Sequence, residues 1–75
     1  MTLAELPLSH CLGARVKSAC RNIYGVVTKV ETQRDEVFLE IVWEGDRRAS
    51  YQPHYELTKV EVFSTKKPLD WQQEQ

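Results

Sequence analysis

The stretch "EVFLEIVW", residues 36–43, alternates between two sets of side chains along its whole length. In an extended strand successive side chains point to opposite faces, so this alternation predicts a strand. One face carries Val37, Leu39, Ile41 and Trp43. The other face carries Phe38, Glu40 and Val42. We therefore expect the first face to enter the core, and the second face to need cover at Phe38 and Val42.

Short polar segments bound this strand on both sides. Residues 32–35, "TQRD", have the composition of a hairpin loop. Residues 44–47, "EGDR", form a second tight turn, in which Gly45 takes a positive φ at little cost. Because short loops join antiparallel neighbours, the chain is expected to pair with residues 36–43 from both sides.

Two further strands are expected upstream. Residues 14–18 alternate small or apolar side chains with basic ones, namely Ala14, Val16 and Ser18 against Arg15 and Lys17. Residues 22–31, "NIYGVVTKVE", are rich in β-branched residues and predict the second strand. Its two faces carry Val26, Thr28 and Val30 on one side and Val27, Lys29 and Glu31 on the other. Gly25 within this run suggests a bulge or a close backbone crossing.

The downstream half predicts two more strands. In "RRASYQ", residues 47–52, the alternation predicts a fourth strand with Ala49 and Tyr51 facing inward. Pro53 cannot donate a ladder hydrogen bond and ends that strand, and "HYEL", residues 54–57, has the length of a single 3-10 turn. A fifth strand is expected in "TKVEVF", residues 58–63, with Val60 and Val62 inward and Lys59, Glu61 and Phe63 outward.

The totals are those of one small soluble domain. A chain of 75 residues buries only roughly 60% of its unfolded surface, so the core must be compact. Apolar residues at 41% and charged residues at 28% are ordinary for a globular protein. We expect an amino-terminal arm at residues 1–12, a folded unit at residues 13–63 and a polar carboxy-terminal tail at residues 64–75.

The amino terminus indicates the cytoplasm. It lacks the basic opening and the continuous apolar run of a secretory signal. No segment approaches the roughly 20 apolar residues that a spanning helix needs. In that compartment Cys11 and Cys20 are expected to be reduced thiols, with a single disulfide between them as the alternative.

Five short strands with one helical turn before the last are the layout of a small five-stranded antiparallel barrel. The residues also resemble the SH3-like barrels of the KOW and Tudor type, and small bacterial and phage proteins of the same pattern. The resemblance is carried by "GARVKS" (13–18), "YGVVTKV" (24–30) and "LEIVWEGDRRASYQPHYELTKVEV" (39–62). It covers residues 13–63 and implies a fold rather than an activity.

Four aromatic side chains could serve either a ligand or the core: Tyr24, Trp43, Tyr51 and Tyr55. In Tudor-like domains, aromatic side chains at strand ends form a cage that attracts a methylated ammonium through cation–π contact. We interpret Trp43 and Tyr51 as core residues because both fall on inward faces. Tyr24 and Tyr55 flank loops, and each can present a ring to a partner.

The residue types that bind metals or perform catalysis do not form a motif. Candidate ligands are His10, Cys11, Cys20 and His54. Their spacing differs from the paired ligands of zinc sites. No pattern places a cysteine or histidine beside Asp46 or Glu56 as a nucleophile and base require. We therefore predict no metal, no cofactor, no small-molecule substrate and no enzymatic activity.

The charge balance disfavours a general polyanion binder, because ten basic and eleven acidic side chains leave a net charge of −1. A local basic and aromatic surface remains the alternative hypothesis. It would use Arg15, Lys17, Arg21 and Tyr24, as a KOW-like module binds nucleic acid, with bases stacked on the ring and phosphates paired with the cations.

Outward-facing apolar residues indicate a contact surface: Phe38, Val42, Phe63 and Trp71. The chain's own ends or a second copy could cover them, and both alternatives stay open. The expected function is a non-catalytic interaction module that binds a protein partner or itself through loop aromatics and a strand edge. Its candidate binding residues are Tyr24, Tyr55, Arg47, Arg48 and Phe63. No contact with a membrane is expected.

Overall fold

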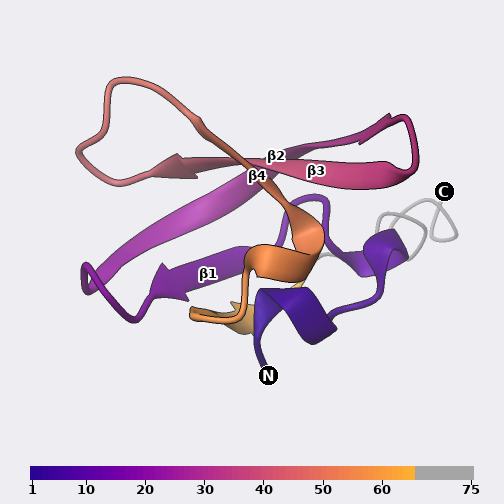
Figure 1. Cartoon of the computed structure of the whole chain (residues 1–75). Coiled ribbons are helices and arrows are strands. Elements are labelled where there is room, and N and C mark those ends of the chain that lie inside the picture. Colours follow the sequence, from indigo (N-terminus) through magenta and orange to yellow (C-terminus); the bar gives the residue numbers. More distant parts are fainter. Residues whose placement is uncertain (66–75) are drawn as a thin grey trace, which may run out of the picture.

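A computed structural model describes residues 1–65 and confirms the all-β class (Figure 1). Five antiparallel strands form one sheet in the order β4-β3-β2-β1-β5. Their bounds are β1 Arg15–Ser18, β2 Ile23–Gln33, β3 Glu36–Trp43, β4 Ser50–Pro53 and β5 Val60–Ser64. Within residues 1–65 the 3-10 turns are η1 Leu3–Glu5, η2 Leu8–His10 and η3 His54–Glu56. The turn predicted before the last strand is η3.

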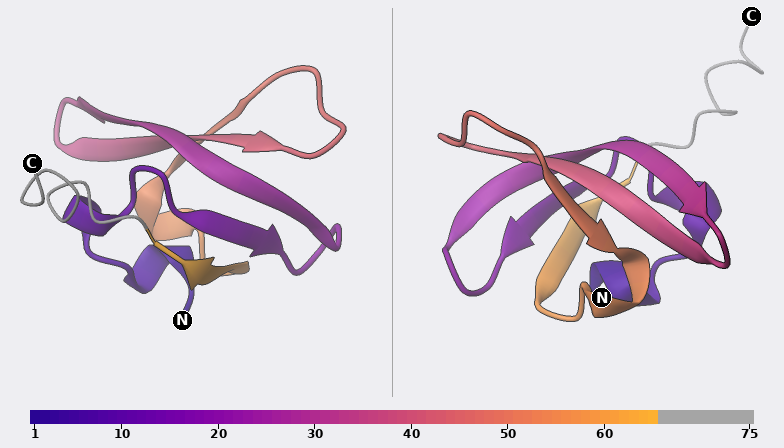
Figure 2. Two further views of the ribbon diagram at one scale, coloured as in Figure 1. Left: turned by 180° about the vertical axis from the view of Figure 1, so that it is seen from behind. Right: turned by 45° about the horizontal axis from the view of Figure 1, so that its top comes forward.

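The sheet is strongly twisted and open (Figure 2). β4 and β5 lie at its two ends, and no ladder joins them in the described part of the chain. The free side of β5 meets the amino terminus, where Thr2 and Glu61 form an isolated bridge. The amide of Val62 also donates to the Met1 carbonyl oxygen at 2.9 Å. Because an exposed strand edge invites pairing with other chains, this cover protects one end of the sheet.

The predicted inward face of β3 forms the centre of the core. Leu39 and Ile41 are fully buried, and Trp43 is 5% exposed. Val16 of β1 and Ala14 just before it are also buried, as the alternation in residues 14–18 predicted. The other buried apolar side chains are Leu3, Leu6, Cys11, Val27, Leu57 and Val60. The core therefore draws on η1, β1, β2, β3 and β5 and on residues that flank the 3-10 turns.

The long strand β2 departs from simple alternation at Thr28. Its register with β3 shifts between Val27 and Lys29, which leaves Thr28 as a bulge. Because a bulge adds one residue, Val27 and Val30 both pack against the core, although they fall on opposite faces by simple alternation. The bulge expected at Gly25 lies instead at Thr28, where the side chain bonds to Glu40.

Gly25 makes the close backbone contact that the sequence suggested as the alternative to a bulge. A Cβ atom placed there would lie 2.6 Å from Cε3 of Trp43 and 3.0 Å from the carbonyl oxygen of Val42. No real Cβ tolerates the first of these distances, so only glycine lets the indole ring lie directly against the backbone of β2.

The inward assignment of Ala49 and Tyr51 was wrong. β4 begins at Ser50, so Ala49 lies outside the strand and is exposed. Tyr51 pairs with Glu40 of β3 and is 42% exposed. Paired residues share a face, and Glu40 lies on the outer face of β3, so Tyr51 points outward as well. Its ring stacks on Phe38 at a centroid distance of 5.8 Å, which gives Phe38 part of its expected cover.

The first eleven residues contribute three buried side chains, Leu3, Leu6 and Cys11, to the core. Leu3 is fully buried, and the amide of Ala4 donates to the carbonyl oxygen of Leu57 at 3.1 Å. Nε2 of His54 lies 2.9 Å from the Leu3 carbonyl oxygen and 3.1 Å from that of Leu6. Because both partners are acceptors, Nε2 carries the proton and donates to them. Figures 1 and 2 show η1 directly against η3 as a result.

Cys11 and Cys20 are both free thiols, as predicted, but their surroundings differ. Cys20 is exposed, whereas Cys11 is buried with its Sγ 3.5 Å from the Pro7 carbonyl oxygen. Burial raises the pKa of the Cys11 thiol to about 11, from an ordinary value of 9.0. At neutral pH this shift lowers the reactive thiolate population of Cys11 about 100-fold relative to an ordinary thiol.

We therefore expect iodoacetamide at pH 8 to alkylate Cys20 of the folded chain well before Cys11. Cys11 should become reactive only in urea, or as the pH rises toward its raised pKa. Peptide mass mapping after timed quenching measures both rates in one sample. Equal alkylation of the two thiols in the native protein would contradict the burial of Cys11.

Candidate functional site

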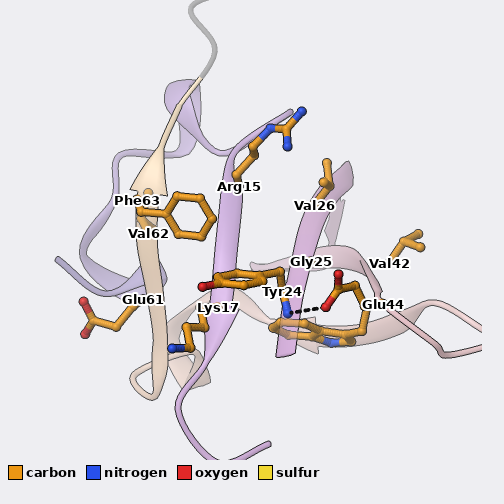
Figure 3. A pocket seen from close by; sticks show the side chains of 11 residues that line it. Arg15, Lys17, Tyr24, Gly25, Val26, Val42, Glu44, Glu61, Val62 and Phe63 are labelled. Carbon is orange, nitrogen blue, oxygen red and sulfur yellow. Dashed lines mark hydrogen bonds between the residues drawn. The ribbon is translucent and has the colours of Figure 1, made fainter. Parts of the chain in front are cut away.

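An open hollow with a volume of about 820 Å³ lies on the outer side of the sheet, opposite the core (Figure 3). We call it the outer groove. Its lining comes from β1, β2, β5 and the end of β3: Arg15, Lys17, Tyr24, Gly25, Val26, Val42, Trp43, Glu44, Glu61, Val62 and Phe63. It is therefore assembled from segments distant in sequence.

Strand register arranges the groove in two rows across the sheet. In one row Arg15 of β1 pairs with Val26 of β2, which pairs with Val42 of β3. In the other row Lys17 stands between Glu61 of β5 and Tyr24 of β2. Since neighbouring strands are about 4.8 Å apart, each row brings side chains of adjacent strands within contact distance. One row is thus largely apolar and the other largely charged.

A bulge on β5 delivers Phe63 to the groove. Along β1 the partner of Arg15 is Ser64 and the partner of Val16 is Val62, so Phe63 has no opposite residue. Its side chain is 56% exposed and meets the Tyr24 ring edge to face at 5.3 Å, with an angle of 80° between the rings. Nζ of Lys17 lies 5.5 Å from the centre of the Tyr24 ring. The two rings and the ammonium form one cluster at the surface (Figure 3).

The charged side chains of the groove differ in the contacts that they make. Oε1 of Glu44 accepts from the backbone amide of Tyr24 at 3.4 Å. Oε1 of Glu61 lies 3.5 Å from the ammonium of Met1, and Glu61 also stands opposite Lys17. Arg15 makes no ion pair with any residue in the range 1–65. Two cations and two carboxylates leave the groove without net charge, and Lys17, like Arg15, makes no ion pair within residues 1–65.

The floor of the groove is closely packed. The Trp43 ring, which lines it, is held from below by the core and from the side by the backbone at Gly25. Binding to a preformed apolar surface loses little conformational entropy. The arrangement suits an apolar side chain of a partner, which would lie between the exposed rings and the valines of the apolar row.

The structure separates the predicted binding residues. Tyr24 and Phe63 meet in the outer groove, whereas Tyr55 lies on η3 and is strongly exposed outside it. The neighbouring carboxylates of Glu36 and Glu56 raise the pKa of Tyr55. Arg47 and Arg48 are exposed in the connection from β3 to β4. Neither Tyr55 nor the two arginines line the groove.

The predicted nucleic-acid residues are also divided. Arg15, Lys17 and Tyr24 line the groove, but Arg21 does not. Its guanidinium donates to both carboxylate oxygens of Asp46, at 2.7 and 3.0 Å. These hydrogen bonds raise the pKa of Arg21 and lower the pKa of Asp46. The Arg21 guanidinium is therefore already paired with a carboxylate of the same chain.

The four aromatics of the cage hypothesis do not form one site. Trp43 is a core residue, as interpreted, while Tyr51 stacks on Phe38 on another part of the sheet. Val42 is exposed, as expected, and Trp71 lies outside the described residues.

Sequence reasoning did not include Val26, Glu44 and Glu61 in the candidate site. No local pattern marks them, because they join the groove only through cross-strand register. Among residues 1–65, no three His, Cys, Asp or Glu side chains gather as metal ligands. The helical turns in this range are too short and too polar to cross a membrane. No family model, curated protein or solved structure matches the chain.

Proposed function

We propose that the chain is a non-catalytic interaction module that binds a peptide segment of a protein partner in the outer groove. The carrying observation is the cluster of exposed aromatic rings over an apolar floor, bounded by charges of both signs. Aromatic and arginine side chains are enriched where protein interfaces bind most strongly. Tyr24, Phe63 and Arg15 supply both types within one hollow.

The charge pattern favours a peptide over a nucleic acid. A strand of phosphates needs several cations without competing anions. In the groove, Glu44 and Glu61 offset Arg15 and Lys17, and Arg21 is engaged by Asp46. The alternative nucleic-acid function therefore keeps two of its three cations, beside two carboxylates that repel phosphate. A peptide, which offers apolar groups and charges of both signs, suits this surface better.

We also propose an SH3-like barrel of the KOW and Tudor type as the fold, acting in the cytoplasm. Support comes from five antiparallel strands in one twisted sheet and from the 3-10 turn η3 before the closing strand. The amino-terminal turn η1 packs against η3 beside β5, which helps to close the side of the fold that the sheet leaves open.

Selection from a random peptide library displayed on phage, followed by calorimetry with the full chain, tests the proposed function. We expect selected peptides to lose about tenfold or more in affinity on Phe63→Ala or Tyr24→Ala, because truncating a central aromatic anchor typically costs more than about 1 kcal/mol. Tyr55→Ala is the matched control, since it removes an exposed ring outside the groove. Its affinities should stay within about twofold of wild type.

Two outcomes would count against the proposal. Peptides that lose affinity on Tyr55→Ala and keep it on Phe63→Ala would place the site at η3. Titration with a fluorescein-labelled single-stranded DNA of thymidines tests the alternative function. Tight binding that falls steeply with salt, and that Arg15→Gln and Lys17→Gln abolish, would favour the nucleic-acid reading. Sedimentation equilibrium of the same samples shows whether the partner is a second copy.

A further inference from the structure

We infer that the outer groove selects peptides in which a carboxylate and a large apolar side chain lie two residues apart, with the carboxylate paired to Arg15. This inference rests on the proposed function and adds the chemistry of the partner. It follows from the one cation of the groove whose register partners on both neighbouring strands are uncharged.

Arg15 stands among neutral neighbours. Its partners in register are Val26 on one side and Ser64 on the other, and the bulged Phe63 lies next to Ser64. No carboxylate is therefore aligned with it in the sheet. Figure 3 shows its side chain at one end of the groove, beside Phe63 and Val26 and away from Glu61. A guanidinium in this position offers its planar donors to an anion from outside.

The other cation of the groove, Lys17, makes no ion pair within residues 1–65 either, but unlike Arg15 it has a carboxylate opposite it in register. Lys17 stands opposite Glu61 and over the Tyr24 ring, and Glu44 accepts from the Tyr24 amide. A ligand cation would compete with existing partners of these carboxylates, whereas a ligand anion would find Arg15 free of ion pairs within the described chain. Charge complementarity thus favours an acidic ligand at the Arg15 end.

The apolar row determines the expected spacing between the two side chains of the ligand. From Arg15 the row continues to Val26 and Val42, one strand apart at each step. In an extended peptide, side chains two residues apart point to the same face and are about 6.6 Å from each other. That separation lets a carboxylate meet Arg15 while the second side chain packs between Phe63 and the valines.

The probe is a capped, extended peptide, acetyl-Gly-Gly-Asp-Ser-Phe-Gly-amide, titrated into the ¹⁵N-labelled full chain and followed by amide chemical shifts. We expect shifts at groove residues, and about fivefold weaker binding when the Asp is replaced by Asn, the upper range for a partly exposed ion pair. In Arg15→Gln the Asp and Asn peptides should bind equally. Lys17→Gln, two residues along the same strand, is the matched control and should keep the preference for Asp.

Four outcomes would overturn the inference. Equal affinity for the Asp and Asn peptides in the wild type, with both weakened by Phe63→Ala, removes the carboxylate preference and leaves the proposed function standing. If the probe fails to bind while neutral peptides selected from the library do bind, the carboxylate preference is again removed and the proposed function stands. If no peptide binds, the proposed function is removed as well. Finally, tighter probe binding in full-length Trp71→Ala would assign the groove to residues 66–75 of the chain itself rather than to a partner.

Discussion

Replacing Trp43 by alanine is expected to lower the free energy of unfolding by about 3–5 kcal/mol, the range for truncating a buried aromatic residue. The ring is 5% exposed and packs against the backbone at Gly25, where no side chain can move in to fill the space. The cavity would therefore stay open and keep its full cost. For a domain of this size that loss is a large part of the total stability.

Urea unfolding followed by far-UV circular dichroism measures this effect without relying on the lost indole. Val42→Ala is the matched control, because Val42 is the preceding residue of the same strand and is exposed on the opposite face. It should change the free energy of unfolding by less than about 1 kcal/mol. Trp43→Phe should fall between the two and keep the chain folded for measurement. A Trp43→Ala midpoint equal to wild type would show that the indole does not support the core.

Replacing Leu3 by alanine is expected to cost about 2–5 kcal/mol, as for other fully buried leucines. Leu3 belongs to the segment that the sequence suggests is an arm, yet it is completely buried. Its turn is fixed to η3 by the amide of Ala4, which donates to Leu57, and by Nε2 of His54. Removing the side chain would leave a cavity between the amino terminus and the last two elements of the fold.

Leu8→Ala in the same segment provides the comparison, because Leu8 is 41% exposed. Its effect on the free energy of unfolding should stay below about 1 kcal/mol. Hydrogen exchange separates local from global effects: if residues 1–12 were a detached arm, Leu3→Ala would leave the protection of β3 amides unchanged. Loss of protection throughout the sheet is the expected result.

The interpretation of β3 from residues 36–43 was confirmed at both ends and on both faces, because its alternation contains no interruption. The interpretation of β4 was wrong for Ala49 and Tyr51, because this short stretch contains too few apolar residues to indicate which of its faces is buried. In β2 the bulge at Thr28 interrupts the alternation. The residue type at this position does not predict a bulge.

The candidate site was likewise predicted in part by the sequence. The sequence identified Tyr24 and Phe63 as residues free to contact a partner, and both are exposed. It also marked Arg15 and Lys17 as outward-facing cations of one strand. It did not indicate that these four side chains line one groove, nor that Arg21 is paired with Asp46 instead.

By itself, the sequence determined the all-β class, the approximate positions of the five strands and the faces that β1, β3 and β5 turn to the core. These features depend on alternation between adjacent residues, which is a local property of the backbone. Only the tertiary structure decided the order β4-β3-β2-β1-β5, the bulges at Thr28 and Phe63 and the groove that they shape. Those features depend on register between strands distant in sequence, where a shift of one residue exchanges the buried and exposed faces.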